Sequence, residues 1–221
     1  MTSFILLQIA QKTTNPQQVE DSIQILLKGG WILLPILLMS IVNIYLIVER
    51  WYVIKGATKK QNILPVIAPM IKEGKIDLAI STCEMSNQPA GRVMASGLRT
   101  IGYPIAEVQE AMEAEARQQV DYLTKGMHYL AIIASVAPMF GFLGTIFGVI
   151  KIFYSISLSD NISIGIISGG LYQKMISSAS GLLVGMIAFA GYHLLSARID
   201  KISSSIEYQC NQLVALLRRN N

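Results

Sequence analysis

The sequence contains few charged residues for a chain of its length. Asp, Glu, Lys and Arg make up 14% of its 221 residues, whereas hydrophobic residues make up 52%. Soluble globular domains contain about 25% charged residues, so this deficit indicates an integral membrane protein. The net charge is only +4, and no basic stripe is interleaved with aromatic residues. The sequence therefore argues against a nucleic-acid-binding protein.

Cysteines are also scarce. Cys83 and Cys210 are the only two, which excludes a disulfide framework and gives no zinc-ligand spacing. The acidic residues between positions 107 and 121 lack the ligand spacing of an EF-hand loop, so we expect them to form a solvated helix face. Because the sequence contains no recognisable nucleophile–base pair or metal-ligand cluster, we predict neither an enzyme nor a bound cofactor or metal.

Three long stretches contain no Asp, Glu, Lys or Arg. They are residues 29–48, 126–150 and 175–197. At a rise of about 1.5 Å per residue, a helix over each stretch is long enough to cross the hydrocarbon core of a bilayer. We therefore predict an all-α integral membrane protein with three transmembrane helices. Asn43, a polar residue inside the first stretch, is expected to join neighbouring helices.

The remaining residues divide the chain further. Charges of alternating sign and apolar residues at helical spacing indicate that the middle of the chain is also helical, outside the membrane. The predicted segments are an outward-facing N-terminal segment with an amphipathic helix (1–28), the first transmembrane helix (29–51), a cytoplasmic helical region (52–125), the second transmembrane helix (126–154), a short periplasmic turn (155–169), the third transmembrane helix (170–197) and a cytoplasmic C-terminal helix (198–221).

Within the cytoplasmic region, the apolar pattern predicts short helices over 63–72 and 76–85, followed by a loop at 87–91. Pro104 suits the first turn of a further helix. Because no breaker is recognisable between Pro104 and Pro138, we predict one continuous helix that runs from the cytoplasm into the membrane. The third transmembrane helix is also predicted to continue beyond the membrane. The second and third helices would thus extend into a cytoplasmic bundle.

Basic residues are distributed unevenly over these segments. They are frequent in residues 50–125 and in the C-terminal tail, whereas the N-terminal segment has only Lys12 and Lys28, and the 155–169 turn has none. By the positive-inside rule, the middle region and the tail face the cytoplasm. We therefore predict a multi-pass protein with its N-terminus in the periplasm and its C-terminus in the cytoplasm.

The second charge-free stretch contains the run APMFGFLGTIFGVI at residues 137–150. One helix face of this run is made of small residues and one hydroxyl, spaced three or four apart: Pro138, Gly141, Thr145 and Gly148. The third stretch has a similar small and hydroxyl-bearing face, which comprises Ser177, Ser178, Ser180, Gly181, Gly185, Ala188 and Gly191. Small residues let helices approach closely in a membrane, and a hydroxyl there either joins helices or forms part of a polar path.

Two runs resemble signatures of a known family. APMFGFLGTIFGVI resembles the second-span signature of the MotA/TolQ/ExbB proton-channel family, and GLYQKMISSASGLLVGMIAF at residues 170–189 resembles its third-span signature. The layout is most similar to ExbB-like biopolymer transport proteins, because flagellar MotA proteins have four spans. The resemblance implies a homopentamer in the inner membrane of a Gram-negative bacterium, with the single span of an ExbD-like partner inside its pore. Protons would cross at an aspartate of that partner, and the motive force would pass to a TonB-like protein that works outer-membrane receptors.

The resemblance also implies roles for individual residues. Thr145 matches the second-span threonine of the family, and Ser178 falls where the third span usually has a threonine. Both would line the lumen, and Ser177 competes with Ser178 for this role. Gln173 falls where many members have a glutamate and is followed by Lys174 instead of a small residue, which weakens the case for a proton-relaying carboxylate in this span. The residues expected to pack helices at subunit contacts are Pro138, Gly141, Gly148, Gly181 and Gly185.

The residues themselves leave several alternatives open. Thr145 could instead bond back to its own helix. No predicted span has an acidic residue at its middle, and hydroxyls do not release protons at physiological pH, so a proton path would need a carboxylate from another chain. The chain is expected to contact membrane lipid as well as the partner chains. Two other functions are also compatible with the sequence: a TolQ-like role in envelope maintenance and a non-conducting membrane scaffold for secretion.

Overall fold

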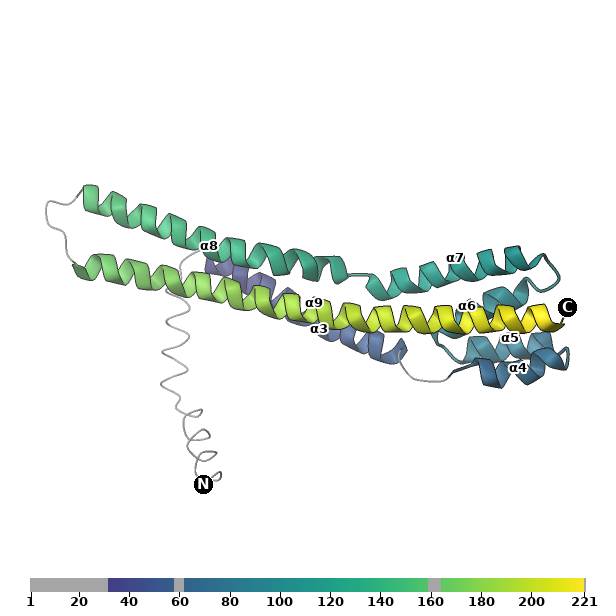
Figure 1. Ribbon diagram of the computed structural model, residues 1–221. Helices are drawn as coiled ribbons and strands as arrows, with labels where there is room; N and C mark the ends of the chain where they lie inside the picture. The colour runs from purple at the N-terminus through teal and green to yellow at the C-terminus, as the bar shows by residue number, and fades with distance from the viewer. Residues whose placement is uncertain (1–31, 58–61, 159–163, 221) are drawn as a thin grey trace, which may run out of the picture. The chain divides into compact units, whose positions relative to one another are not determined.

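The computed structural model describes residues 32–57, 62–158 and 164–220, which form helices and no named strand (Figure 1). The helices are α3 (Leu33–Ala57), α4 (Leu64–Lys72), α5 (Ile76–Met85), α6 (Pro89–Arg99), α7 (Ile105–Thr124), α8 (Met127–Ser157) and α9 (Ile164–Asn220). Stretches of α3, α8 and α9 are long and apolar enough to cross a membrane. The prediction of an all-α protein with three candidate membrane spans is confirmed. The amphipathic helix predicted within residues 1–28 lies outside the described residues.

The chain divides into two compact units. The first unit comprises Met1–Ile44 and Ala131–Phe189, and the second comprises Tyr45–Leu130 and Ala190–Asn221. Helices α4 to α7 belong to the second unit, whereas α3, α8 and α9 contribute residues to both. Helix α9 is unbroken over its whole length, and the extension of its C-terminal part beyond the membrane stays a prediction.

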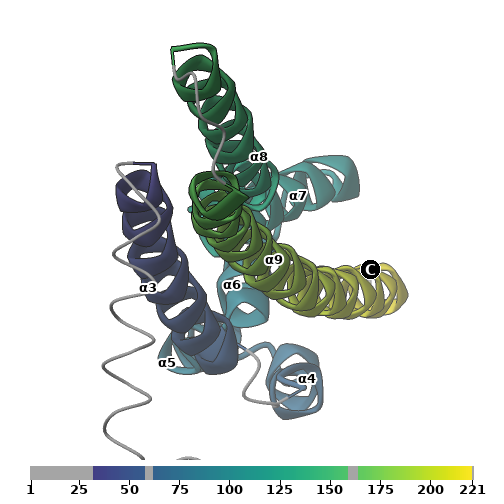
Figure 2. The same ribbon diagram turned by 90° about the vertical axis from the view of Figure 1, so that its left-hand side faces the viewer.

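In the first unit, α8 and α9 pack side by side (Figure 2). Ala137 of α8 and Ala188 of α9 are buried in this unit. Asn43 of α3 is buried as well, and its side-chain amide donates a hydrogen bond to the backbone oxygen of Val184 over 3.5 Å. This contact joins α3 to α9, as predicted for a polar residue inside a span.

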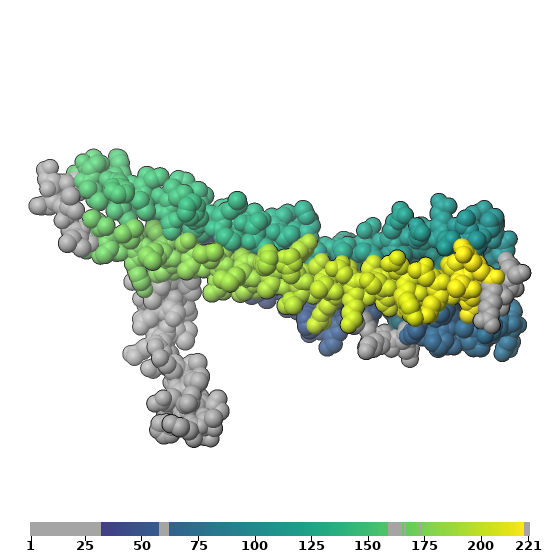
Figure 3. Space-filling view, in the orientation of Figure 1, coloured from purple at the N-terminus to yellow at the C-terminus, as the bar shows by residue number. Residues whose placement is uncertain are grey.

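Large apolar side chains cover the outer surface of α8, which is coloured teal to green in the space-filling view (Figure 3). Those that are more than 45% exposed in the single chain include Met139, Phe142, Phe147 and Phe153. A soluble monomer rarely leaves so large an apolar surface uncovered. Lipid or further protein chains are therefore the expected surroundings of this face.

In the second unit, α6 packs against both α5 and α7, and α4 packs against α5. Met94 and Leu98 of α6 are buried in this small core. The loop predicted over 87–91 is wrong at its C-terminal end, because α6 begins at Pro89. Proline suits the first turn of a helix, where its missing N–H would have no partner within the helix.

The continuous helix predicted after Pro104 is wrong, because two helices meet at residues 125–126. Helix α7 ends at Thr124 and α8 begins at Met127. Gly126 has a φ of 84°, the left-handed conformation that commonly ends a helix and that favours glycine. The helix boundary is therefore encoded by this one glycine rather than by a proline.

A buried arginine lies at the end of α7. The Arg50 guanidinium donates a hydrogen bond to the backbone oxygen of Tyr122 over 3.4 Å and forms an ion pair with Glu49 at 2.6 Å. The C-terminal end of a helix carries partial negative charge, so a cation at this position is stabilising.

The turn predicted over 155–169 is helical at both of its ends. Helix α8 continues to Ser157 and α9 begins at Ile164, and residues 159–163 lie outside the described part of the chain. The Ser157 hydroxyl donates to the backbone oxygen of Tyr154 over 2.8 Å. Serines in this segment can thus bond to carbonyl groups of their own helix instead of opening a turn.

Candidate functional site

The small residues of α8 and α9 face each other within one chain. A Cβ atom built on Gly181 would lie 2.6 Å from the Ala137 backbone oxygen and 2.9 Å from Gly141 Cα. A Cβ atom built on Gly141 would lie 2.9 Å from the Ser178 backbone oxygen. Because these neighbours are backbone atoms, the two helices touch through their main chains, and any side chain at these positions would push them apart.

Pro138 occupies space that Gly185 leaves open on α9. A Cβ atom built on Gly185 would lie 2.5 Å from Pro138 Cγ. These two residues, together with Gly141, Gly148 and Gly181, are predicted from the sequence to pack at contacts between subunits. In the structure all five lie at the contact between α8 and α9 of the same chain, and a contact with another subunit stays a prediction.

Ser177 is buried against Gly144. Its side chain has no exposed surface, and its Oγ would lie 2.5 Å from a Cβ atom built on Gly144. Among the described residues, this hydroxyl has no hydrogen-bond partner. A buried hydroxyl without a partner is destabilising by about 1–3 kcal/mol. Ser177 therefore packs inside the helix pair in the single chain, and its role in lining a pore stays a prediction.

Thr145 is half-buried on α8, between Gly144 and Gly148. Its hydroxyl donates a hydrogen bond to the backbone oxygen of Phe142 over 2.6 Å, which is the bond back to its own helix considered from the sequence. This bond uses the one donor of the hydroxyl and leaves the oxygen lone pairs as acceptors. Thr145 can therefore accept a hydrogen bond from a protonated acid or a water molecule.

Two further residues with predicted roles lie on α9. Ser178 is half-buried, and its backbone contacts Gly141 of α8. Gln173 belongs to the α9 backbone, but its side chain lies outside the described part of the structure. The structure thus brings Ser178 to the contact between α8 and α9. Their exposure to a lumen stays a prediction.

The structure adds Lys174 to this helix contact, a residue to which the sequence assigned no role. A Cβ atom built on Gly148 would overlap the Lys174 side chain, lying 2.5 Å from Cδ and 2.8 Å from Cε. Gly148 is therefore the residue that leaves room for the lysine. The signal in the sequence was the spacing, because Lys174 precedes Ser177 and Ser178 by three and four residues and so shares their face of the helix.

The described part of the first unit contains two charged residues, Lys151 and Lys174, and no Asp or Glu. Among all the described residues, no group of three or more His, Cys, Asp or Glu could hold a metal ion. The hydroxyls of this unit can solvate a charge, but they cannot release a proton at physiological pH. The α8–α9 contact can therefore line a proton path only if another chain brings the titrating group.

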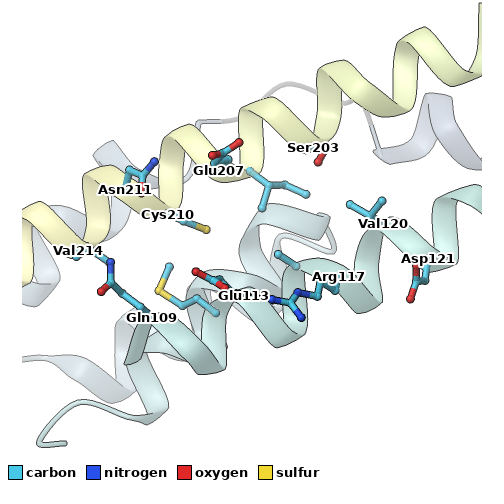
Figure 4. Close-up of a pocket in the computed structure, with 13 residues that line it drawn as sticks. Gln109, Glu113, Arg117, Val120, Asp121, Ser203, Glu207, Cys210, Asn211 and Val214 are labelled. Carbon is cyan, nitrogen blue, oxygen red and sulfur yellow. Dashed lines mark hydrogen bonds and ion pairs between the residues drawn. The ribbon is translucent and has the colours of Figure 1, made fainter. Parts of the chain in front are cut away.

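In the second unit, α7 and α9 line a groove of about 430 Å³ (Figure 4). Its lining includes the apolar side chains of Met112, Val120 and Ile206. Cys210 also lines it, and burial, with a smaller contribution from Glu207, raises the pKa of this thiol to about 11. The thiol is therefore protonated at neutral pH and is a weak nucleophile.

Residues 85–208, which include the α8–α9 contact, match the MotA/TolQ/ExbB proton channel family. An ExbB-like biopolymer transport protein of Synechocystis sp. is 23% identical over 194 residues, which cover 86% of this chain and 92% of that protein. An ExbB homologue of Methanothermobacter thermautotrophicus is 29% identical over 155 residues (70% and 54%). The Tol-Pal system protein TolQ of Haemophilus influenzae is 25% identical over 115 residues (52% and 50%). The chain thus spans about half the length of the last two relatives.

Proposed function

Because this chain belongs to the MotA/TolQ/ExbB proton channel family, we propose that it is a subunit of a proton-driven motor in the inner membrane. One observation supports the proposal above all: the closely packed α8–α9 contact bears hydroxyls, whereas the described part of the first unit contains no carboxylate. Such a chain can line a proton path but needs a proton carrier from a second chain. The proposal assigns the chain a role in ion-driven transport and not in enzymatic catalysis.

In the proposed assembly, copies of the chain form a pentameric ring whose N-termini are periplasmic and whose C-termini are cytoplasmic. The exposed apolar surface of α8 supports contacts with lipid and with neighbouring subunits. The ring encloses the single span of an ExbD-like partner that carries an aspartate. Proton passage at this aspartate drives a TonB-like protein and thereby TonB-dependent transport across the outer membrane.

Thr145 and Ser178 line the lumen of this ring, close to the partner's aspartate. The Thr145 hydroxyl proton is held by the Phe142 backbone oxygen, so Thr145 acts as an acceptor toward the protonated acid. An acid that loses such a partner would be buried with an unsatisfied proton, so its protonated form would be destabilised and proton uptake would become less favourable. Ser177 supports the same path from inside the helix pair. Gln173 contributes an amide, which can form hydrogen bonds but cannot relay a proton as a carboxylate does.

Two experiments test the proposal. The chain is first purified together with any small single-span protein that binds it in the cell membrane, and proton flux is then measured in vesicles that contain the complex. We expect a stable complex whose partner has one intramembrane carboxylate, together with proton flux. A homo-oligomer with no such partner and no flux would favour the non-conducting scaffold.

A TolQ-like role is the second candidate, supported by the similarity to the Haemophilus influenzae protein. A deletion strain distinguishes the two roles. Loss of energised uptake through outer-membrane receptors would support the ExbB-like role. Leakage of periplasmic proteins with normal uptake would support the TolQ-like role.

A further inference from the structure

Lys174 lies on the face of α9 that packs against α8. It precedes Ser178 by one helical turn, and the glycine that it covers, Gly148, follows Thr145 by about one turn on α8. The lysine is therefore adjacent, along both helices, to the two hydroxyls proposed to face the proton carrier. A helical turn rises about 5.4 Å, a distance that a lysine side chain can span.

No Asp or Glu among the described residues of its own unit balances the charge of Lys174. Among the described residues of the first unit, Lys151 is the other charged group, and Tyr154 and Tyr172 are the other titratable groups. Lys151 is exposed, whereas Lys174 is half-buried with its stem across Gly148. Lysines in membrane spans are costly and pair with anionic groups or lie at the interface. Lys174 thus has the position of a cation whose counter-ion comes from another molecule.

We propose that Lys174 is the counter-ion of the proton-carrying carboxylate of the partner span. This inference rests on the proposed function, because the carboxylate belongs to the second chain. A nearby ammonium favours the ionised form of a carboxyl group, and a cation within about 4–6 Å lowers a carboxyl pKa by about 1 to 3. Lys174 would therefore hold the carboxylate ionised at the level of Thr145 and Ser178 until a proton arrives.

The first test measures proton flux as a function of pH, with the complex of this chain and its partner in vesicles of neutral phosphatidylcholine. For Lys174→Met we expect the flux midpoint to move to higher pH by about 1 to 3, because the neighbouring cation is gone. Lys174→Arg keeps the charge and should keep the wild-type midpoint. Lys151→Met is the matched control, since it removes the other lysine of the unit, and it should leave the midpoint unchanged.

Several outcomes would contradict the inference. A wild-type midpoint for Lys174→Met would show that the lysine does not act on the carboxylate. Equal shifts for Lys174→Met and Lys151→Met would show a general effect of positive charge. A wild-type midpoint that depends on added phosphatidylglycerol would identify a lipid phosphate as the counter-ion of Lys174. Wild-type complexes without any flux would instead overturn the proposed function, and the inference with it.

A second test moves the lysine without changing it. In Gly148→Ala the new Cβ would overlap the Lys174 stem, so the ammonium must shift and the midpoint should again move to higher pH. In a Lys174→Ala background the same glycine substitution should cause no additional shift. Gly169→Ala is the control, because a Cβ atom at Gly169 would meet nothing within 4 Å. An additional shift in the Lys174→Ala background would show that Gly148 acts through packing alone.

Discussion

Replacing Gly181 by alanine perturbs the α8–α9 contact where the added Cβ would come closest to backbone atoms of the facing helix. The added Cβ would lie 2.6 Å from the Ala137 backbone oxygen and 2.9 Å and 3.0 Å from Gly141 Cα and N. Ordinary contacts are about 3.5–4.0 Å long, so the two helices must separate by roughly 1 Å. No flexible side chain can absorb this shift, because the three atoms belong to the backbone.

A second variant isolates the free-energy cost of this clash from the change in helix propensity. Overpacking of this kind costs about 1–3 kcal/mol, whereas alanine in place of a helical glycine gains about 0.8–1.0 kcal/mol in helix propensity. Gly169→Ala has the same gain in propensity without the clash, because its Cβ would have open space. The difference in stability between Gly181→Ala and Gly169→Ala therefore measures the contact alone.

The assay is thermal unfolding of both variants in the same detergent. For a chain of 150–250 residues, each kcal/mol corresponds to about 2–4 °C in Tm, so Gly181→Ala should melt about 2–12 °C below Gly169→Ala. Equal melting temperatures would refute the reasoning, because they would mean that α8 and α9 do not touch through their backbones at this point.

Three further predictions concern other parts of the chain. Thr145→Val should leave the complex assembled, since a hydroxyl in a membrane helix contributes only about 0.6–2 kcal/mol. It should reduce proton flux by about five-fold to 150-fold, because the protonated carrier would be left with an unsatisfied buried donor at a cost of about 1–3 kcal/mol. Wild-type flux would make Thr145 a packing residue. Alkylation of Cys210 by iodoacetamide should be about a hundred-fold slower at pH 7 than alkylation of a thiol of pKa 9.0, because the pKa of Cys210 is raised to about 11. The rate, measured after subtracting the Cys210→Ala background, should rise about tenfold per pH unit. A rate that levels off below pH 9 would contradict this. Gly126→Ala should lower the unfolding free energy by about 1–2 kcal/mol, because alanine is strained at a φ of 84°, and an unchanged Tm would show that the junction between α7 and α8 can adopt another conformation.

The membrane helices were predictable because long stretches without charged residues identify them. Residues 29–48, 126–150 and 175–197 exclude charge over a length that only a membrane or a large core requires, and the structure has α3, α8 and α9 at these places. The joining role of Asn43 followed from the same logic, since a polar group inside a span needs a partner.

Short helices and helix ends were harder to predict because single residues decide them. Helix α6 begins with Pro89 and contains Gly91 in its first turn. Proline and glycine are typical of loops, so this first turn was predicted to be a loop. Gly126 lies between α7 and α8, and a single glycine does not by itself show that a helix ends there. Its left-handed conformation, which ends α7, becomes visible only in the backbone geometry.

The small residues illustrate a different limit of sequence reasoning. A stripe of glycines indicates that another helix packs closely against it, but it does not identify that helix. The stripes of α8 and α9 were predicted to pack at contacts between subunits. In the structure they meet each other within one chain, and a contact with a further subunit stays a prediction. This pairing also assigns Gly148 a different structural role, because the space that this glycine leaves is filled by the aliphatic stem of Lys174. A glycine on one helix and a lysine on another, separated by more than twenty residues of sequence, can be recognised as one feature only after the two helices are placed side by side. The lysine is then held by packing, and its ammonium group is available for an anion that the described part of the first unit does not supply.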